Sequence, residues 1–105
     1  MDTNFAISTS NLRVTQVRQD VTGNNIANIN TDRFEAKDIV QSDANPGVSV
    51  AAIRKTPNNN PLGYSNTDLA KEMTNMMVNK DTYAANASVI KVQDRMIGEV
   101  IDLIR

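Results

Sequence analysis

The sequence predicts a mainly α-helical chain, with a long helix at each end and a short β-hairpin and loop between them. Proline is confined to the middle of the 105-residue chain, at Pro46, Pro57 and Pro61. Helix interiors exclude proline because its ring clashes with the preceding turn. Both ends instead hold long stretches of helix-forming residues with one glycine each, Gly23 and Gly98. We expect a single rod-like domain over residues 1–105.

The first predicted helix spans residues 4–30. An asparagine-rich stretch over 24–31 ends it, because asparagine tolerates left-handed backbone and bonds to its own neighbours. The apolar residues form two arcs at helical spacing. One arc holds Ile7, Val14, Val17 and Val21, and the other holds Phe5, Leu12 and Ile26.

A β-hairpin is predicted over residues 37–55. The alternating stretches 37–41 and 47–53 are typical of strands, and residues 43–47 supply the turn between them. Residues 56–65 are polar and rich in asparagine and proline, which predicts a flexible linker.

The second predicted helix spans residues 67–105. Ser65, Asn66 and Thr67 offer capping oxygens, while Asp68 and Glu72 are interpreted as surface charges near the positive end of the helix dipole. Such a helix is about 55 Å long at 1.5 Å per residue. A compact domain of this length is only about 26 Å across, so we expect a rod.

Apolar residues recur along the second helix at heptad spacing. This pattern predicts a seam, the line along which one helix contacts another, interrupted by Lys80 and Asp94. We expect it to pack on the first helix. Its residues are Leu69, Met73, Met76, Tyr83, Ala87, Ile90, Ile97 and Ile101.

A second apolar face lies on the opposite side of the last helical turns. It holds Val89, Val92, Met96, Val100 and Leu103. When two helices pair, each buries only one of its faces. A helix that is apolar on two faces therefore needs further neighbours. We therefore expect these residues, with Phe5, Leu12 and Ile26, to contact other subunits.

Composition excludes many chemistries. The chain has no cysteine and no histidine, which removes thiol and histidine catalysis and the ligands of zinc-finger, iron–sulfur and haem sites; the carboxylates do not cluster, and we expect no catalytic, cofactor or metal site. A net charge of -1 argues against nucleic-acid binding. We find no run of apolar residues long enough for membrane insertion and no signal peptide.

Two motifs carry a resemblance to the bacterial flagellar rod and hook proteins. The N-terminal motif is Asn25-Ile26-Ala27-Asn28, followed by Thr31 and the aromatic Phe34. The C-terminal motif covers residues 66–73, 75–77, 83–86 and 96–98, including Asn86. The short middle is similar to that of the small proximal-rod proteins. Such proteins usually have glycine before the aromatic, where this chain has Arg33, and a left-handed turn there would cost an arginine more.

The resemblance implies that the terminal helices pair as an antiparallel coiled coil and line a tubular assembly. The chain would then be a self-assembling structural subunit of the flagellar basal-body rod in the periplasm, exported by the type III apparatus without a cleavable signal peptide. Its partners would be copies of itself and other axial flagellar proteins. Asn25, Asn28 and Asn86 would be polar residues that set the helix register.

An alternative from another class remains open. A helical adaptor or export chaperone would also expose apolar helix faces, in order to cover amphipathic helices of another flagellar or secretion protein. The two hypotheses differ in oligomeric state. A rod subunit forms filaments or high oligomers, whereas an adaptor stops at a dimer or a 1:1 complex.

Overall fold

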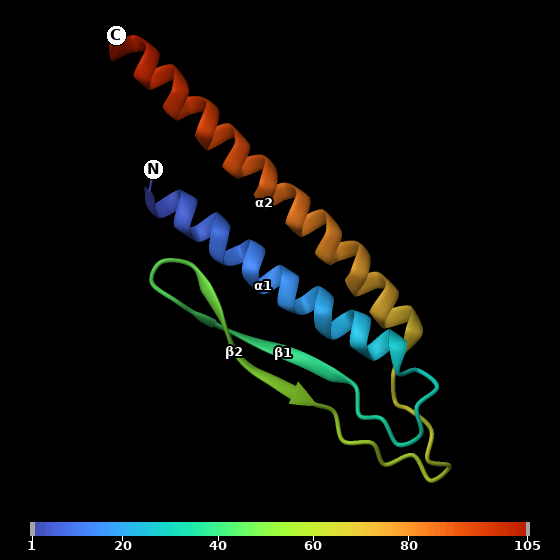
Figure 1. Cartoon of the computed structure of the whole chain (residues 1–105). Helices are drawn as coiled ribbons and strands as arrows, with labels where there is room; N and C mark the ends of the chain where they lie inside the picture. Colours follow the sequence, from blue (N-terminus) through green and yellow to red (C-terminus); the bar gives the residue numbers. More distant parts are fainter. Residues whose placement is uncertain (1, 105) are drawn as a thin grey trace.

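The computed structural model describes residues 2–104 and places four elements along the chain. They are α1 (Asp2–Ala27), β1 (Lys37–Asp43), β2 (Val48–Lys55) and α2 (Leu69–Ile104). The predicted fold class is confirmed, because two long helices flank a two-stranded antiparallel hairpin (Figure 1). Arg105, which the prediction placed in the second helix, lies outside the described residues, as does Met1.

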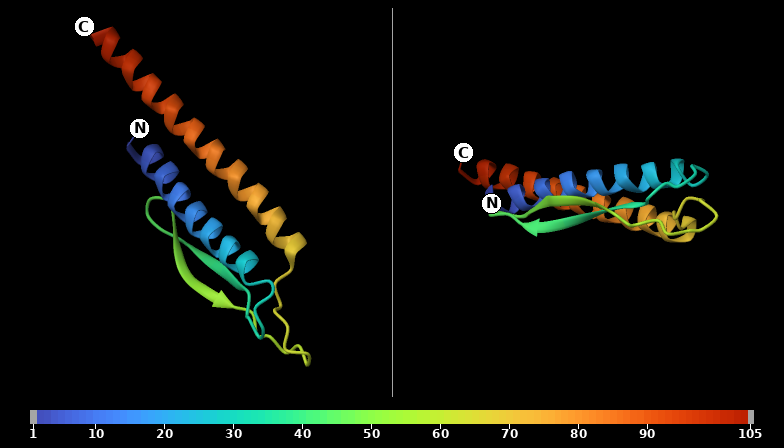
Figure 2. Two further views of the ribbon diagram at one scale, coloured as in Figure 1. Left: turned by 45° about the vertical axis from the view of Figure 1, so that its right-hand side comes forward. Right: turned by 90° about the horizontal axis from the view of Figure 1, so that it is seen from below.

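The molecule is an elongated rod with α1 in the middle. Its Cα atoms extend over 70 × 24 × 13 Å. The radius of gyration is 18.4 Å, whereas a compact domain of this length has about 13 Å. Helix α1 lies between α2 and the hairpin (Figures 1 and 2). Among the described elements, α2 packs against α1 alone.

Asparagine ends α1, three residues before the predicted boundary at residue 30. The Asn28 side chain donates to the Asn24 carbonyl at 2.8 Å, and the Asn28 amide N–H also bonds to that carbonyl. Thr31 then donates to Asn28 Oδ1 at 2.9 Å. These bonds satisfy groups that the last helical turn leaves without intrahelical partners. The asparagine-rich stretch therefore acts as the predicted stop and turn.

The hairpin occupies the predicted span and is fastened to α1 at its turn. Its strands pair from Lys37 opposite Lys55 to Asp43 opposite Val48. The Val48 N–H donates to Ser10 Oγ of α1 at 3.2 Å. A Cβ at position 47 would overlap that hydroxyl, and Gly47 has a φ of 100°. Only glycine combines this backbone conformation with such close approach.

The face of α1 that meets the hairpin is apolar. Ser10, which contacts the hairpin turn, shares its helix face with Ile7, Val14 and Val17. Val14 on α1 and Ile39 on β1 are the buried hydrophobic side chains of the described residues, at 3% and 6% exposure. The hydrophobic core of this chain therefore belongs to α1 and the hairpin.

Asparagine side chains form hydrogen bonds across the segment predicted as a flexible linker. Asn58 Nδ2 donates to the carbonyls of Phe34 and Tyr64, at 2.9 and 2.6 Å. Asn66 Oδ1 accepts from the Ala36 N–H at 2.7 Å, while its Nδ2 donates to the Thr56 carbonyl at 3.0 Å. A loop of polar residues can thus close on itself because amide side chains replace backbone partners.

Helix α2 begins one residue after its cap. Lys71 N–H donates to Asp68 Oδ1 at 3.2 Å, and the Glu72 N–H bonds to the Asp68 carbonyl, so Asp68 is the N-cap. The prediction assigned capping to residues 65–67. Ser65 instead accepts from the Thr67 N–H at 3.2 Å in the turn before the helix.

Candidate interaction surface

Helices α1 and α2 meet through polar side chains. Asn25 Nδ2 donates to Glu72 Oε1 at 3.1 Å, Asn79 Nδ2 to Gln19 Oε1 at 3.2 Å, and Asn11 Nδ2 to Asn86 Oδ1 at 3.3 Å. Along α2 these positions are seven residues apart, while along α1 they run in the opposite direction. The helices are therefore antiparallel. We call this contact the polar seam; it comprises Ser8, Asn11, Thr15, Gln19, Thr22 and Asn25 of α1 with Glu72, Asn79 and Asn86 of α2.

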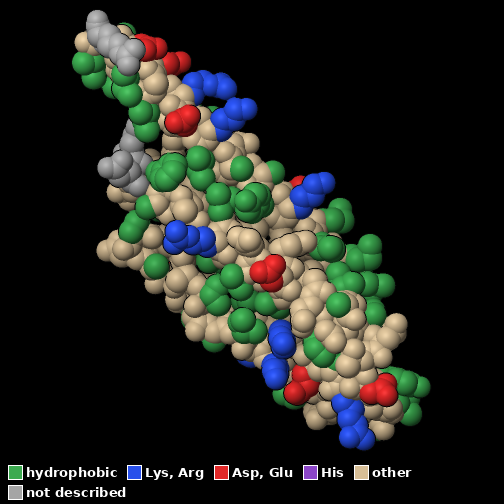
Figure 3. Space-filling view, viewed as in Figure 1, with side chains coloured by type: hydrophobic (Ala, Val, Ile, Leu, Met, Phe, Trp, Pro, Cys, Tyr) green, Lys and Arg blue, Asp and Glu red, His purple; other side chains and the backbone are tan. Residues whose placement is uncertain are grey.

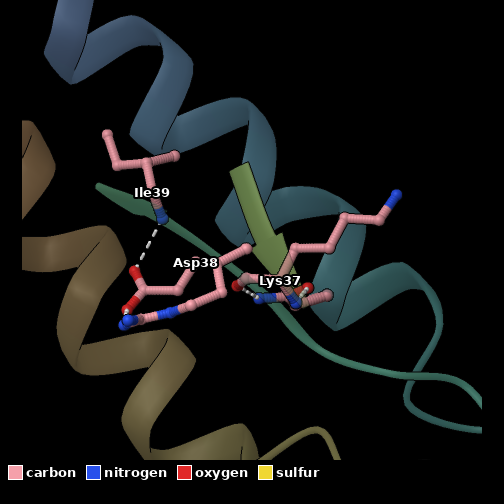
Figure 4. Close-up of polar contacts among 5 residues, drawn as sticks. Lys37, Asp38 and Ile39 are labelled. Carbon is pink, nitrogen blue, oxygen red and sulfur yellow. Dashed lines mark hydrogen bonds and ion pairs between the residues drawn. The ribbon is translucent and has the colours of Figure 1, made fainter. Parts of the chain in front are cut away.

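Asn25 joins three elements and is the most buried side chain of the seam, at 1% exposure. Its Nδ2 donates to the Lys37 carbonyl at 2.7 Å, and its Oδ1 accepts from the Lys37 N–H at 2.9 Å. Lys37 begins β1, which runs on beside α1 through Asp38 and Ile39 (Figure 4). With its bond to Glu72, this one amide links α1, α2 and the hairpin.

The polar seam replaces the apolar seam that the heptad pattern predicted. Of those predicted residues, only Ile90 is half-buried. The rest are exposed in the single chain: Leu69, Met73, Met76, Tyr83, Ala87, Ile97 and Ile101. Glu72, predicted as a surface charge, is buried at 4% exposure.

The reason for this difference lies in α1. Its apolar arc through Val14 is used by the hairpin, so α2 meets the neighbouring arc, which is polar. A buried amide or hydroxyl needs a hydrogen-bond partner, and Asn79 and Glu72 supply such partners where leucine or methionine could not. The sequence does contain a signal for the face of α2 that meets α1: positions 72, 79, 86 and 93 lie at heptad spacing and are all polar. At the last position, Gln93 Oε1 is buried without a hydrogen-bond partner among the described residues.

The second predicted face also lies open. On α2 it is exposed at Val89, Val92, Met96, Val100 and Leu103. On α1, Phe5 is exposed, whereas Leu12 and Ile26 are half-buried. Apolar side chains gather along the α2 edge and near its C-terminal end (Figure 3). The helix pair is thus polar along its internal contact and apolar on the outside.

The end of α2 has no helix beside it. Continuing the antiparallel pairing places Asp2 opposite Arg95, so residues 96–104 extend past α1 by about 14 Å. We call this segment the overhang (red in Figure 1). Met96, Ile97, Val100, Leu103 and Ile104 are all exposed on it.

The motif residues of the N-terminal half have separate tasks. Asn25 forms the three-way junction, and Asn86 bonds across the seam; their role in setting the helix register stays a prediction. Asn28 bonds only within the turn, to Asn24 and Thr31, so its predicted register role is corrected to a helix stop. Ile26 is half-buried and Ala27 is exposed. Phe34 is half-buried, and its carbonyl accepts from Asn58 and from the Asn66 N–H.

Arg33 adopts the left-handed backbone, with a φ of 60°. Its N–H donates to the Gly63 carbonyl at 2.6 Å, which ties the end of the turn to the loop before α2. The turn that usually carries glycine is therefore kept, although a non-glycine residue is strained there.

Within residues 2–104, no group of three or more acidic side chains could hold a metal ion. None of the described helices is long and apolar enough to cross a membrane. The helix pair instead presents a set of exposed apolar faces.

Comparison with known proteins matches both ends of the chain. Residues 5–34 match the family model described as "Flagella basal body rod protein", and residues 62–103 match "Flagellar basal body rod FlgEFG protein C-terminal". These matches cover most of α1 and of α2 but not the hairpin.

Individual relatives agree with the family models. Flagellar basal body rod protein FlgB of Agrobacterium fabrum is 33% identical over 118 residues, covering 89% of this chain and 88% of the relative. Flagellar hook protein FlgE of Escherichia coli is 32% identical over 84 residues, covering 75% of this chain. Hook protein FlgE of Salmonella typhimurium is 42% identical over 45 residues. The chain spans 21% of the first hook protein and 11% of the second.

Proposed function

The chain belongs to the flagellar basal-body rod protein family, and from this premise we propose that it is a structural subunit that self-assembles through α1 and α2 into the tubular rod. The observation that carries the proposal is the apolar outside of α2. Side chains such as Met77 and Leu103 are 68% and 86% exposed, although α2 is an ordered helix over its described length. Burial of each such side chain contributes about 1.5–3 kcal/mol.

The amount of exposed surface also supports association. The chain exposes 7486 Å², whereas a compact monomer of 11.5 kDa exposes about 5,800 Å². The difference of about 1,700 Å² is about twice the roughly 800 Å² that each partner contributes to a standard protein–protein interface. A solitary rod would leave this area in water, and side-by-side packing of copies would remove it.

The partners in this proposal are copies of the same chain and other axial flagellar proteins. The location is the periplasmic rod of the basal body, reached through the type III export apparatus. The subunit has no catalytic role and needs no cofactor. The support for these statements is the family and the similarity to a rod protein along nearly its whole length.

Sedimentation velocity and electron microscopy of the purified chain over a range of concentrations test the proposal. We expect filaments or high oligomers to appear as concentration rises. Val92→Glu together with Val100→Glu should abolish them, because both side chains are about half-exposed on the face assigned to neighbours and two charges would have to be buried there.

A matched control separates the helices from the hairpin. Ile53 on β2 is 53% exposed, similar to Val92 at 52%, so Ile53→Glu outside the helices is the matched control for the single variant Val92→Glu. The Ile53→Glu variant should assemble as the unmodified chain does. Circular dichroism should show unchanged helix content in all variants. A chain that stops at a dimer at every concentration would contradict self-assembly and favour the adaptor hypothesis.

A further inference from the structure

The two ends of the rod are different. One end is the overhang, a helix with apolar side chains and no neighbour in the chain. The opposite end is formed by the loop between β2 and α2, which exposes Leu62 and Tyr64 at 72% and 59% (Figure 1). Two unlike apolar ends on one molecule allow head-to-tail contact between copies, which forms an open filament when the rotation from copy to copy does not close into a ring.

The loop end contains a hollow of about 270 Å³. It is lined by Arg33, Asn58, Asn60, Pro61, Leu62 and Gly63. Arg33 is the one ionisable residue of this lining, and its side chain lies beside Gly63. The hollow thus combines an apolar wall at Pro61 and Leu62 with a single positive charge.

The overhang carries the complementary chemistry. Within residues 96–104 the ionisable side chains are Glu99 and Asp102, and both are acidic. They are three residues apart and so lie on one side of the helix, with the exposed Leu103 next to Asp102. A carboxylate and an apolar side chain therefore stand together, as an arginine and an apolar wall do in the hollow.

We propose that the hollow at the loop end receives the overhang of a second copy, with Arg33 pairing with Glu99 or Asp102 and Leu103 lying against Leu62. The occupant is a second copy because the same chain supplies both complementary ends and an excess of exposed area. This inference rests on the proposed function, since it names the contact that continues the assembly along the rod.

The proposal gives Arg33 a task that its backbone conformation does not explain. At a φ of 60° an arginine is strained and glycine is not. If position 33 served the turn alone, Arg33→Gly would improve both the fold and the assembly. We expect Arg33→Gly to raise the urea midpoint of the monomer but to weaken assembly.

Charge reversal with rescue tests the contact. For the full chain we expect Arg33→Glu to raise the critical concentration for assembly about ten-fold or more, as loss of a charge pair of about 1.4 kcal/mol predicts. Combining it with Glu99→Arg and Asp102→Arg should restore assembly. Lys55→Glu reverses an exposed charge on β2, outside the two helices, and should leave the critical concentration unchanged.

The outcomes separate this inference from the proposed function. Equal assembly of Arg33→Glu and the unmodified chain would overturn the inference and leave self-assembly standing. Loss without restoration by the reversed acidic residues would overturn the pairing with the overhang. Absence of any association, even for the unmodified chain at high concentration, would contradict the proposed function itself.

Discussion

Helix α1 makes two contacts of opposite character. Toward the hairpin it presents an apolar arc, where Val14 and Ile39 are buried. Toward α2 it presents the amides of Asn11, Gln19 and Asn25. These amides bond across the seam to Asn86, Asn79 and Glu72, in that order. Apolar burial contributes most to stability and is not directional, whereas hydrogen bonds contribute less but fix geometry. The hairpin contact therefore stabilises the chain, and the polar seam sets how α2 is rotated.

This difference explains why the apolar residues of α2 are free for other copies. If Met76 and Tyr83 were buried against α1, they would not be available for contact with other copies. Because Asn79 and Asn86 face α1 instead, the apolar stripes of α2 point outward. Three substitutions, one in the apolar contact and two in the polar seam, test this difference in stability.

The largest effect is expected in the apolar contact. Ile39→Ala should lower the free energy of unfolding of the dilute chain by about 3 kcal/mol, because it removes a buried side chain and leaves a cavity. Urea unfolding followed by circular dichroism measures it. Ile53 is the cross-strand partner of Ile39 but is 53% exposed, so Ile53→Ala should cost about 1 kcal/mol or less. If both variants lost the same unfolding free energy, the contact between α1 and the hairpin would not be the hydrophobic core of the chain.

Asn25→Ala should have the next largest effect, at about 2 kcal/mol. It leaves the Lys37 N–H and carbonyl and the Glu72 carboxylate without their partner, and buried polar groups are costly when unpaired. The neighbouring Asn24 is exposed, so Asn24→Ala should change the urea midpoint little. Hydrogen exchange at the start of β1 should accelerate in the first variant alone. Unchanged protection there would contradict the junction.

Gln93→Leu should give the smallest effect and the opposite sign. Its buried Oε1 lacks a partner, so an apolar side chain of similar size should raise the free energy of unfolding by about 1 kcal/mol. Gln16 is exposed on α1, and Gln16→Leu should bring no such gain. A loss of stability in Gln93→Leu would mean that this position is satisfied in solution.

Much of the architecture follows from local signals in the sequence. Proline placement and helix propensity locate α1 and α2, and turn residues locate the hairpin. Boundaries were less accurate where asparagine was involved, because one amide can stop a helix, as Asn28 does, or bridge elements, as Asn25 does. The type of residue does not distinguish these two tasks; only its long-range partner does.

The orientation of α2 could not be derived from periodicity. Its apolar and polar series share the same heptad period and are offset by three residues, as Met76 and Asn79 illustrate. Hydrophobicity alone assigns the apolar series to the interior. The polar arc of α1 reverses that choice, because the hairpin already covers the apolar one. The polar series through Glu72 and Asn79 is visible in the sequence, but its meaning depends on how three elements share α1.

The polar seam also has a calorimetric consequence. Exposure of apolar surface is what raises the heat capacity on unfolding, and a chain of this length normally shows about 1.3–1.6 kcal/mol/K. Here Val14 and Ile39 are the buried hydrophobic side chains of the described residues, and the large apolar side chains of α2, except the half-buried Ile90, stay exposed in the single chain. Its unfolding heat capacity should be unusually small, and association of copies should carry the large negative change. The free energy of assembly, rather than that of folding, should therefore change most strongly with temperature.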